Sequence, residues 1–369
     1  MSDRLRVGVV FGGRSGEHEI SLLSARSVLG ALDATRYEAV QIGITHDGRW
    51  FTGEHVLESF EQGRLDELYS AVLPADAGLR CLFHWGEGSP MELVSRLDVV
   101  FPVLHGSFGE DGTIQGLLEL ADVPYVGAGV LASSVAMDKA LFKDLMRSRG
   151  LPVADWVLLL SSAIAGDPAG AAARGEAAGP YPLFTKPANL GSSVGVSKVR
   201  GRSDMIEGLM DAARYDRRVI VESGVDAREI EVSVLGNESP EASVPGEILP
   251  SDEFYSYRAK YIDDTSRLLI PAPLDKATAE EARRLAVEAY RAIDGAGMAR
   301  ADFLLDRKTG DLFLNELNTI PGFTRISMYP KLWDAAGLPY PELMDRLIEL
   351  ALERQRQKDR LERRYGEAA

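Results

Sequence analysis

The part of the chain best equipped for chemistry carries two carboxylates, an amide and a guanidinium at alternate positions. It spans residues 299–318, where two apolar runs flank a polar, glycine-containing segment of five residues. This pattern predicts a β-hairpin with a short loop, in which Asp306 pairs with Leu312. Side chains alternate between the faces of a strand, and cross-strand partners share a face. Counting on from that pair, one face carries Asp302 opposite Glu316 and Arg300 opposite Asn318, and the other carries Ala301, Phe303, Phe313 and Leu317.

This polar face has two interpretations. Two carboxylates, an amide and a guanidinium are costly to cover without a counter-charge. Carboxylate and amide oxygens suit Mg²⁺, which proteins usually hold through one or two carboxylates and the phosphates of a substrate. The face therefore predicts either a magnesium site or a solvated sheet surface with a cross-strand ion pair.

Strands, glycine turns and helices alternate along the first 125 residues of the chain. Buried strands are predicted at residues 6–11, 39–44 and 98–104. Polar glycine turns follow the first and third of these strands, at residues 12–17 and 105–112, and each turn leads into a helix. This alternation is typical of a doubly wound α/β unit, which places ligands at the carboxyl ends of its strands.

The rest of the chain mixes helices with strands, as in an α+β domain. A helix is predicted at residues 131–149, and residues 161–180, rich in Ala, Gly and Pro, are predicted to form a surface loop with one weak helix. Residues 251–269 form a polar and aromatic segment of a length typical of functional lids. The other predicted strands are residues 181–186, 194–199, 219–222 and 229–235, and the other predicted helices are residues 203–213, 278–292 and 341–364.

Composition excludes several classes of function. The 369 residues suggest two or three domains, and 41 basic against 56 acidic residues give a net charge of −15, which excludes nucleic-acid binding through bulk electrostatics. No apolar run could span a bilayer and the first residues do not resemble a signal peptide, so we expect a cytoplasmic protein without a membrane partner. The single cysteine, Cys81, excludes an intrachain disulfide and a multi-cysteine metal site, and the five histidines lack metal-ligand spacing.

Several other polar residues have a functional and a structural interpretation. The Gly/Ser loop at residues 186–195, with Lys186 at its mouth, is either a phosphate cradle or an ordinary hairpin turn, and it lacks the order of a Walker A loop. Glu17, at the start of a helix, either caps that helix or binds an ammonium group. His105 either donates to a substrate carboxylate or is structural. Lys260 and Tyr261 are either exposed or close over an active site, and Glu222 and Glu229 either bind ribose hydroxyls or have no such role.

Seven motifs together give the chain a family resemblance. They lie at residues 12–21, 105–116, 137–139, 186–195, 257–261, 299–303 and 315–324. With them, residues 6–352 resemble the D-alanine–D-alanine ligases of the ATP-grasp superfamily. The resemblance implies three domains, namely residues 1–125 (doubly wound, substrate-binding), 126–214 (central lid with the Gly/Ser loop) and 215–369 (with the loop 251–269 and the metal hairpin). One departure is Thr185, where an apolar residue is more usual, and its hydroxyl is expected to face away from the lysine side.

The resemblance also implies an ATP site between two antiparallel sheets. Lys139 and Lys186 would contact the α- and β-phosphates, and residues 222–225 would form the adenine hinge, with Glu229 on the ribose. Two Mg²⁺ or Mn²⁺ ions would be held by Asp302, Glu316 and Asn318, and a monovalent cation is a further candidate. The residues assigned to ATP by this resemblance are Lys139, Lys186, Ser193, Glu222, Val225, Glu229 and Lys260.

The resemblance assigns a second group of residues to two D-alanine molecules. Glu17 would bind the ammonium of the first, with Ser192 and Tyr261 hydrogen-bonded to Glu17 across the site. Arg300 and the Gly322 N–H would stabilise the tetrahedral intermediate. The carboxylate of the second D-alanine would be held by Ser327 and the Met328 backbone, and His105 is a further substrate-binding candidate.

The expected activity is ATP-dependent synthesis of D-alanyl-D-alanine through a D-alanyl phosphate, for peptidoglycan, by a homodimer. One alternative is a relative that makes D-alanyl-D-lactate or D-alanyl-D-serine. The depsipeptide enzymes carry a histidine-bearing loop, whereas this chain has Tyr261 there and no histidine after residue 105. A non-catalytic ATP-binding regulator and a different carboxylate–amine ligase of the superfamily are two further hypotheses.

Overall fold

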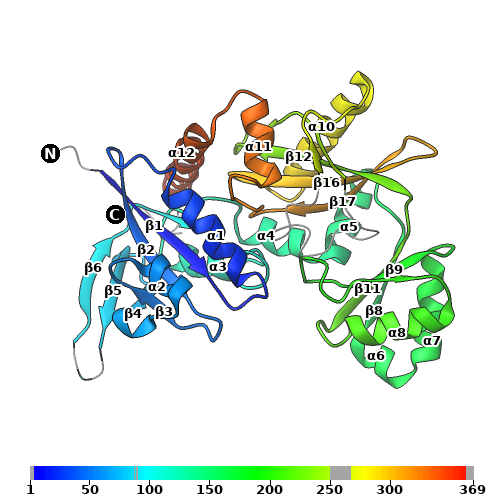
Figure 1. Ribbon diagram of the computed structural model, residues 1–369, viewed down its shortest axis with the longest axis horizontal. Helices are drawn as coiled ribbons and strands as arrows, with labels where there is room; N and C mark the ends of the chain where they lie inside the picture. Colours follow the sequence, from blue (N-terminus) through cyan, green and yellow to red (C-terminus); the bar gives the residue numbers. More distant parts are fainter. Residues whose placement is uncertain (1–3, 87, 89, 250–266, 363–369) are drawn as a thin grey trace.

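A first lobe of the molecule is built on one mixed sheet, with the chain's last helix packed against it (Figure 1). The computed structural model describes residues 4–86, 88, 90–249 and 267–362. Strands β1, β2 and β7 are parallel, as predicted, and α1 and α3 follow the two glycine turns. These elements span β1 (Leu5–Gly12), β2 (Tyr37–Ile44), β7 (Val99–Pro102), α1 (His18–Leu29) and α3 (Thr113–Leu120).

Four further strands extend this sheet in the order β6-β5-β4-β3-β2-β1-β7, and all four pair antiparallel. The sequence analysis missed them because each is only three to five residues long and several alternate weakly between buried and exposed positions. The added elements are β3 (Trp50–Thr52), α2 (Val56–Gln62), η1 (Leu65–Glu67), β4 (Tyr69–Val72), β5 (Cys81–Trp85) and β6 (Glu92–Arg96). Cys81 is buried, as expected of a packed small side chain.

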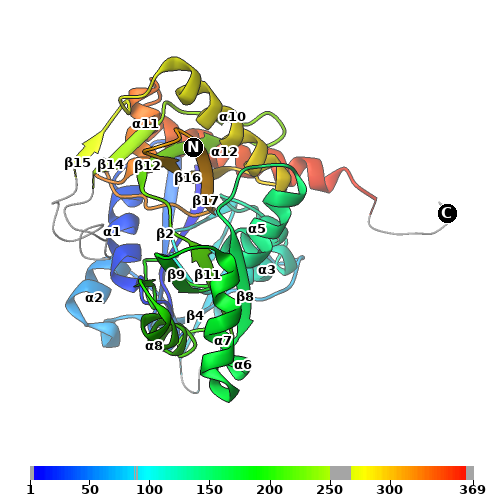
Figure 2. The ribbon, with the colours of Figure 1, turned by 90° about the vertical axis from the view of Figure 1, so that its right-hand side faces the viewer.

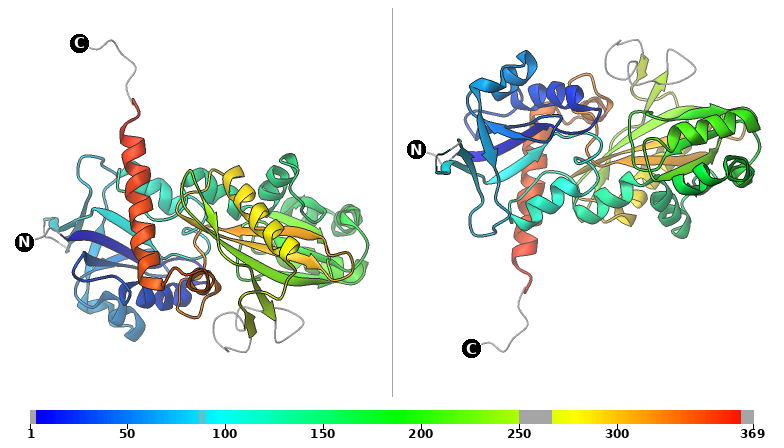
Figure 3. Two further views of the ribbon diagram at one scale, coloured as in Figure 1. Left: turned by 90° about the horizontal axis from the view of Figure 1, so that it is seen from above. Right: turned by 90° about the horizontal axis from the view of Figure 1, so that it is seen from below.

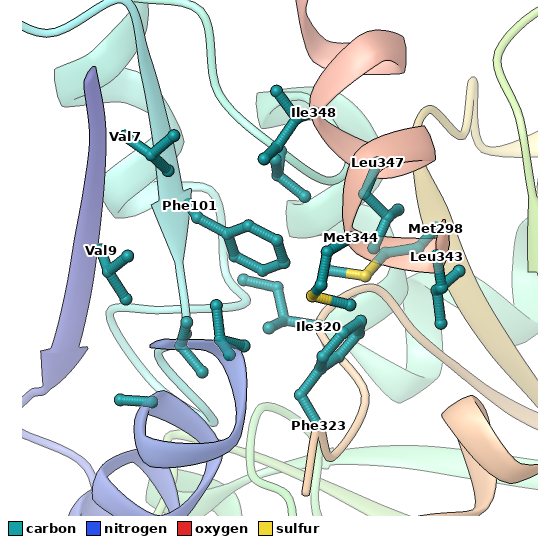
Figure 4. Packing of buried hydrophobic residues seen from close by; sticks show 14 of the residues in the cluster. Val7, Val9, Phe101, Met298, Ile320, Phe323, Leu343, Met344, Leu347 and Ile348 are labelled. Atoms are coloured by element: carbon teal, nitrogen blue, oxygen red, sulfur yellow. The ribbon is translucent and has the colours of Figure 1, made fainter. Parts of the chain in front are cut away.

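Helix α12 (Tyr340–Asp359) supplies the missing half of this lobe's core. Figure 4 shows Met344 and Leu347 facing Phe101 of β7, beside Val7 and Val9 of β1. The views in Figure 3 show the helix lying across the first lobe. Residues more than 200 positions apart therefore share one apolar core, and the predicted terminal helix is confirmed.

The central sheet has the order β10-β9-β11-β8 and is covered by α6, α7 and α8 (Figure 2). Residues 161–180, predicted to be mostly loop, instead form α6, α7 and η2. Pro168 at the first helical position and Asp167, which accepts from the Gly170 N–H, start α7, and small side chains allow close packing. The elements are β8 (Trp156–Leu160), α6 (Ser161–Gly166), α7 (Pro168–Gly175), η2 (Glu176–Ala178), β9 (Leu183–Pro187), β10 (Ser197–Val199), α8 (Arg202–Ala212) and β11 (Arg218–Ser223).

The third sheet runs β15-β14-β12-β16-β17, with β13 paired to β12, and α4, α5 and α10 pack on one face. The helix predicted at 131–149 is two helices, because Asp138 breaks it and caps the second by accepting from the Ala140 and Leu141 N–H groups. The elements are α4 (Val130–Met137), α5 (Lys139–Ser148), β12 (Ala227–Leu235), β13 (Glu241–Ala242), β14 (Gly246–Leu249), β15 (Arg267–Leu269), α10 (Lys276–Ala292), β16 (Met298–Asp306), β17 (Leu312–Asn318) and α11 (Met328–Ala335).

Sheet membership differs from the division at residues 125 and 214 that the sequence analysis expected. Strand β11 pairs with β8 and β9, so the central sheet continues past residue 214. Helices α4 and α5 share their apolar core with β12, β16 and β17, although they precede the central sheet in sequence. The central sheet is thus an insertion between elements that pack together. Among the described residues, no helix is long and apolar enough to cross a membrane.

The hairpin β16–β17 has a β-bulge that the sequence analysis did not predict. Asp302 pairs with Glu316 and Arg300 with Asn318, as predicted, but Leu305, and not Asp306, pairs with Leu312. The register shifts between Asp302 and Phe303. Beyond the shift the face of β17 is reversed, so Leu314 is buried while Phe313, predicted on the buried face, lies opposite Leu304 on the polar side.

Thr185 provides a test of packing in the central sheet. It is fully buried on the face that meets α8, away from Lys186, and its hydroxyl has no hydrogen-bond partner among the described residues. We expect Thr185→Val to raise the free energy of unfolding by about 1 kcal/mol, because it removes an unsatisfied polar atom without changing shape. Thr185→Ser, which keeps the hydroxyl and loses a methyl group, should be destabilising by about 1 kcal/mol. Urea unfolding measures both, and a Val variant less stable than the parent would contradict the prediction.

Candidate active site

The polar face of the hairpin lies between the two antiparallel sheets. Arg300 donates to both carboxylate oxygens of Asp302, at 2.7 and 2.6 Å, and Asn318 Nδ2 donates to Asp302 Oδ2 at 3.0 Å. Lys139 Nζ lies 3.6 Å from Glu316 Oε2. The four side chains predicted to share a face therefore do so, and cations compensate both carboxylates.

These residues fit a divalent metal bound together with phosphates. Among the described residues, no group of three or more His, Cys, Asp or Glu side chains is arranged to hold a metal ion. Two carboxylates and one amide oxygen are, however, the incomplete hard-oxygen set that Mg²⁺ uses when phosphates supply its other ligands. Their present partners, Arg300 and Lys139, are themselves suited to a phosphate or carboxylate.

Three lysines converge on a buried glutamate beside this face. Lys139 and Lys143 lie one turn apart on α5, and Lys186 lies on β9. Lys186 Nζ donates to Glu222 Oε2 at 2.5 Å, and Lys143 Nζ lies 3.5 Å from Glu222 Oε1. Burial alone would raise the pKa of Glu222, but the Lys143 and Lys186 ammonium groups lower that pKa to about 2. Burial lowers the pKa of Lys143.

Helix α5 is held on the central sheet by a second buried ion pair. Arg218 of β11 contacts Asp138, the N-cap of α5, with Nε 2.8 Å from Oδ2. Arg218 and Glu222 lie four residues apart on β11, so they share the strand face that looks toward α5. One contact thus fixes the helix, and the helix carries two of the three lysines toward Glu222.

The Gly/Ser loop joins β9 to β10, where the sequence analysis placed it. Its base is fixed by Asp216, which accepts from the N–H of Asn189 at 2.8 Å and from its side-chain amide at 2.9 Å. Ser192 and Ser193 have φ of +51° and +59°. Left-handed backbone in non-glycine residues is uncommon and concentrates at functional turns. Lys139 also donates to the Leu190 carbonyl at 2.7 Å, which ties the loop to α5.

Glu17 links the loop to the first lobe. It precedes α1, is almost fully buried, and accepts a hydrogen bond from Ser192 Oγ at its Oε1 atom. Its N–H donates to Ser15 Oγ at 3.1 Å, and Ser15 Oγ donates to the His105 carbonyl at 2.6 Å. The predicted contact between Glu17 and Ser192 is therefore present, although no cation yet faces the carboxylate among the contacts described.

His105 has both ring nitrogens engaged by protein atoms. Nδ1 lies 3.0 Å from the Ile320 carbonyl and Nε2 lies 2.9 Å from Ser24 Oγ. Burial lowers the pKa of His105. We assign the neutral tautomer, in which Nδ1–H donates to Ile320 and Nε2 accepts from Ser24. The structure thus favours the structural interpretation of His105, because both nitrogens have partners other than a substrate carboxylate.

Glu110 also contacts the backbone of Ile320, the residue whose carbonyl His105 contacts. Its two oxygens accept from the Gly106 N–H at 2.9 Å and the Ile320 N–H at 3.1 Å. Burial, assisted by the nearby Glu17 carboxylate, raises the pKa of Glu110 to about 8. Ile320 is therefore held through both its N–H and its carbonyl, two residues before the buried Gly322 whose N–H is predicted to stabilise the intermediate.

Four more of the predicted residues have described positions. Ser327 immediately precedes α11 and bonds to Thr324 Oγ1 at 2.7 Å, and Met328 is the first residue of α11, where backbone N–H groups lack helical partners. Val225 lies between β11 and β12, and Glu229 lies opposite Leu304. Lys260 and Tyr261 lie outside the described residues, as does most of the predicted lid.

Sequence reasoning gave no role to four residues of the site. Glu231 lies across from Asp302, with Oε2 3.0 Å from Arg300 Nε, and Lys143, Glu110 and Arg218 occupy the positions described above. Glu231 was detectable, since it alternates with Glu229 on a predicted strand. Nothing local to the sequence indicates which distant group the other three would meet.

The family comparisons agree with this geometry. A family model described as the N-terminus of D-ala D-ala ligase matches residues 6–128, and one described as its C-terminus matches residues 145–349. The chain belongs to the D-alanine–D-alanine ligase family. A relative named D-alanine–D-alanine ligase, from Thermoanaerobacter sp. strain X514, is 51% identical over 360 residues, covering 97% of this chain and 99% of that relative.

Solved structures of D-alanine–D-alanine ligase relatives share the whole fold, which is the ATP-grasp fold. The D-alanine–D-alanine ligase of Coxiella burnetii is 35% identical with a TM-score of 0.80, covering 97% of each chain. The VanG D-Ala:D-Ser ligase of Enterococcus faecalis is 32% identical with a TM-score of 0.84, covering 95% of this chain and all of that one. Both named specificities therefore occur on this fold, and the fold alone does not choose between them.

Gly106 is required beside Glu17. It has φ of +71°, and an added Cβ would lie 2.4 Å from Glu17 Oε2. We expect Gly106→Ala to be destabilising by about 1–2 kcal/mol, from its left-handed backbone. Displacement of Glu17 should also lower ligase activity at least about tenfold. Gly116→Ala is the matched control, because that helical glycine has no atom within 4 Å of an added Cβ. Equal activity in both variants would contradict the prediction.

Glu110 should make stability depend on pH. Its pKa rises on folding from an ordinary 4.5 to about 8, so the folded chain binds the proton more tightly and loses this stabilisation as pH rises through that window. Relative to Glu110→Gln, which does not titrate, the parent should lose on the order of 1 kcal/mol per pH unit between pH 5 and 8. Denaturant unfolding at pH 5, 7 and 9 measures the difference. Parallel stability profiles would show that the carboxylate is ionised throughout.

Proposed function

We propose that this chain joins two D-alanine molecules into D-alanyl-D-alanine at the expense of ATP, as a step in making peptidoglycan. One observation carries the proposal: the Glu17–Ser192 hydrogen bond places an ammonium-binding carboxylate against the Gly/Ser loop. The hairpin with Arg300 and Asp302 lies close enough that Glu17 and Arg300 both act electrostatically on His105. The proposed amino-acid site and the proposed phosphate site therefore lie next to each other.

The residues around the cleft divide into a nucleotide group and an amino-acid group. We assign Lys139 and Lys186 to the phosphates, with Ser193 of the loop beside them. The negative charges of Glu222, Glu316 and Glu229 raise the pKa of Lys186, so this lysine stays protonated and able to bind a phosphate. The proposed adenine and ribose contacts come from residues 222–225 and Glu229. The proposed metal ligands are Asp302, Glu316 and Asn318, and bound Mg²⁺ would neutralise the phosphate charge that develops during transfer.

In the first proposed step, the carboxylate of the first D-alanine attacks the γ-phosphorus of ATP. A new O–P bond forms, the bond to the β-phosphate oxygen breaks, and D-alanyl phosphate and ADP result. Glu17 holds the substrate ammonium, and Lys139 and Lys186 hold the phosphates in line, so catalysis rests on positioning and charge.

In the second step, the neutral amine of the second D-alanine attacks the acyl carbon. Arg300 and the Gly322 N–H stabilise the negative oxygen of the tetrahedral intermediate, which collapses to the dipeptide as phosphate leaves. The attacking nitrogen gives up one of its two protons as the amide forms, and the departing phosphate takes it up and leaves as HPO₄²⁻. We assign the carboxylate of the second D-alanine to Ser327 and the Met328 N–H, at the start of α11.

A D-serine acceptor is the second candidate, because the VanG D-Ala:D-Ser ligase shares the fold closely. Sequence identity supports D-alanine as the acceptor. Relatives named D-alanine–D-alanine ligase are 45–51% identical to this chain, whereas the VanG enzyme is 32% identical. Tyr261 remains the residue predicted to separate dipeptide from depsipeptide synthesis.

We also propose a cytoplasmic homodimer that associates through the first lobe. Strands β5 and β6, at one edge of the first sheet, expose Trp85 and Leu93 on the same face, and exposed apolar surface of this kind is typical of a protein interface. Met91, just before β6, is exposed as well.

Phosphate release with ATP and Mg²⁺ tests the function. D-alanine alone should support release matched one-to-one by dipeptide, L-alanine should not, and chelation of the metal should abolish the activity. D-serine and D-lactate, each added with D-alanine, test the acceptor. A mixed product formed in preference to D-alanyl-D-alanine would move the assignment to another specificity. Release with no D-amino acid combination would refute it.

A further inference from the structure

Of the three described lysines that converge on Glu222, Lys143 has no assigned role. Its side chain is 0% exposed, and among the described residues its Nζ makes no hydrogen bond. Its nearest anion is Glu222 Oε1, at 3.5 Å, and that oxygen also accepts no hydrogen bond from the described residues. A fully buried ammonium group is expensive unless a charge partner requires it.

In the absence of ligand, two lysine ammonium groups lie beside the single negative charge of Glu222. Oε2 accepts from Lys186 at 2.5 Å, while Oε1 faces Lys143. The two lysines differ in exposure: Lys186 lies on β9 at the mouth of the loop with 15% of its side chain exposed, whereas Lys143, on α5, is fully buried. Only Lys186 can readily move toward a ligand.

Nucleotide binding would separate these two contacts. In the function proposed above, on which this inference rests, Lys186 turns to the phosphates of ATP and its bond to Glu222 breaks. Glu222 would then be a buried carboxylate beside the adenine base that has lost its hydrogen bond to Lys186, and a buried charge left without a counter-charge is strongly disfavoured. Lys143, fixed in place, is the remaining cation.

We propose that Lys143 is a positioning residue that keeps Glu222 ionised and oriented as a hydrogen-bond acceptor for the amino group of adenine while Lys186 is engaged by phosphate. The consequence is base selectivity. An ionised carboxylate accepts from the 6-amino group of ATP and repels the 6-oxo group of ITP, whereas a protonated one donates to the latter.

Equilibrium binding of ATP and ITP to the full chain, without amino acid, tests this role independently of the proposed reaction. Lys143→Met keeps the length of the side chain and removes its charge. We expect the Kd for ATP to rise about tenfold, because Glu222 loses its remaining counter-charge, and the Kd for ITP to change less than about threefold. With saturating D-alanine, the KM for ATP should rise similarly while kcat changes little. Lys308→Met, on the exposed hairpin loop, is the control and should behave as the parent.

A double-mutant cycle separates this role from packing. In a Glu222→Gln background no carboxylate needs a counter-charge, so adding Lys143→Met should change ATP binding less than about twofold. An equal loss in both backgrounds, or an unchanged Kd and ATP:ITP ratio in Lys143→Met, would overturn the proposal. If Lys143→Met alone fails to fold, a folded Lys143→Met/Glu222→Gln variant supports the pairing. A double variant that also fails to fold assigns Lys143 to packing and overturns it.

Discussion

The site depends on one set of buried hydrogen bonds between the lobes. Its two halves lie on separate sheets, and Ile320 is the residue at which they meet: Glu110 accepts its N–H and His105 contacts its carbonyl. Ser24 extends the contact, since it also accepts from the Phe323 N–H at 3.4 Å. Because unmade buried backbone bonds are costly, the turn that carries Gly322 has one preferred position relative to Glu17. Catalysis by positioning requires this constraint.

Several charged groups of the site are paired with protein groups of opposite charge. Three cations proposed to meet a ligand already have protein partners of opposite sign: Arg300 has Asp302 and Glu231, Lys139 has Glu316, and Lys186 has Glu222. Ligands would therefore exchange partners and would not meet bare charges, which reduces the desolvation cost of the empty site. When a ligand takes one member of an ion pair, the protein group that remains can discriminate between ligands.

The sequence predicted contacts between residues that are close together in the chain, and it missed contacts between residues that are far apart in it. Alternation placed Arg300, Asp302, Glu316 and Asn318 on one face, and their pairing across the strands is confirmed. The bulge that reverses Phe313 was not predictable, because an inserted residue leaves the apolar runs intact. Residues 161–180 form two α-helices and a 3-10 helix where one weak helix was predicted, because Asp167 and Pro168 start α7 within a composition that indicates a loop. Lys143 and Glu110 acquire their partners only through tertiary structure.

The position of α12 constrains synthesis of the protein. Its apolar side chains complete a core whose other members, such as Val7 and Phe101, leave the ribosome more than 200 residues earlier. The first lobe therefore emerges with an apolar surface that stays uncovered until α12 has been made. Contacts so distant in sequence slow folding, and a chain truncated before α12 would expose this surface permanently.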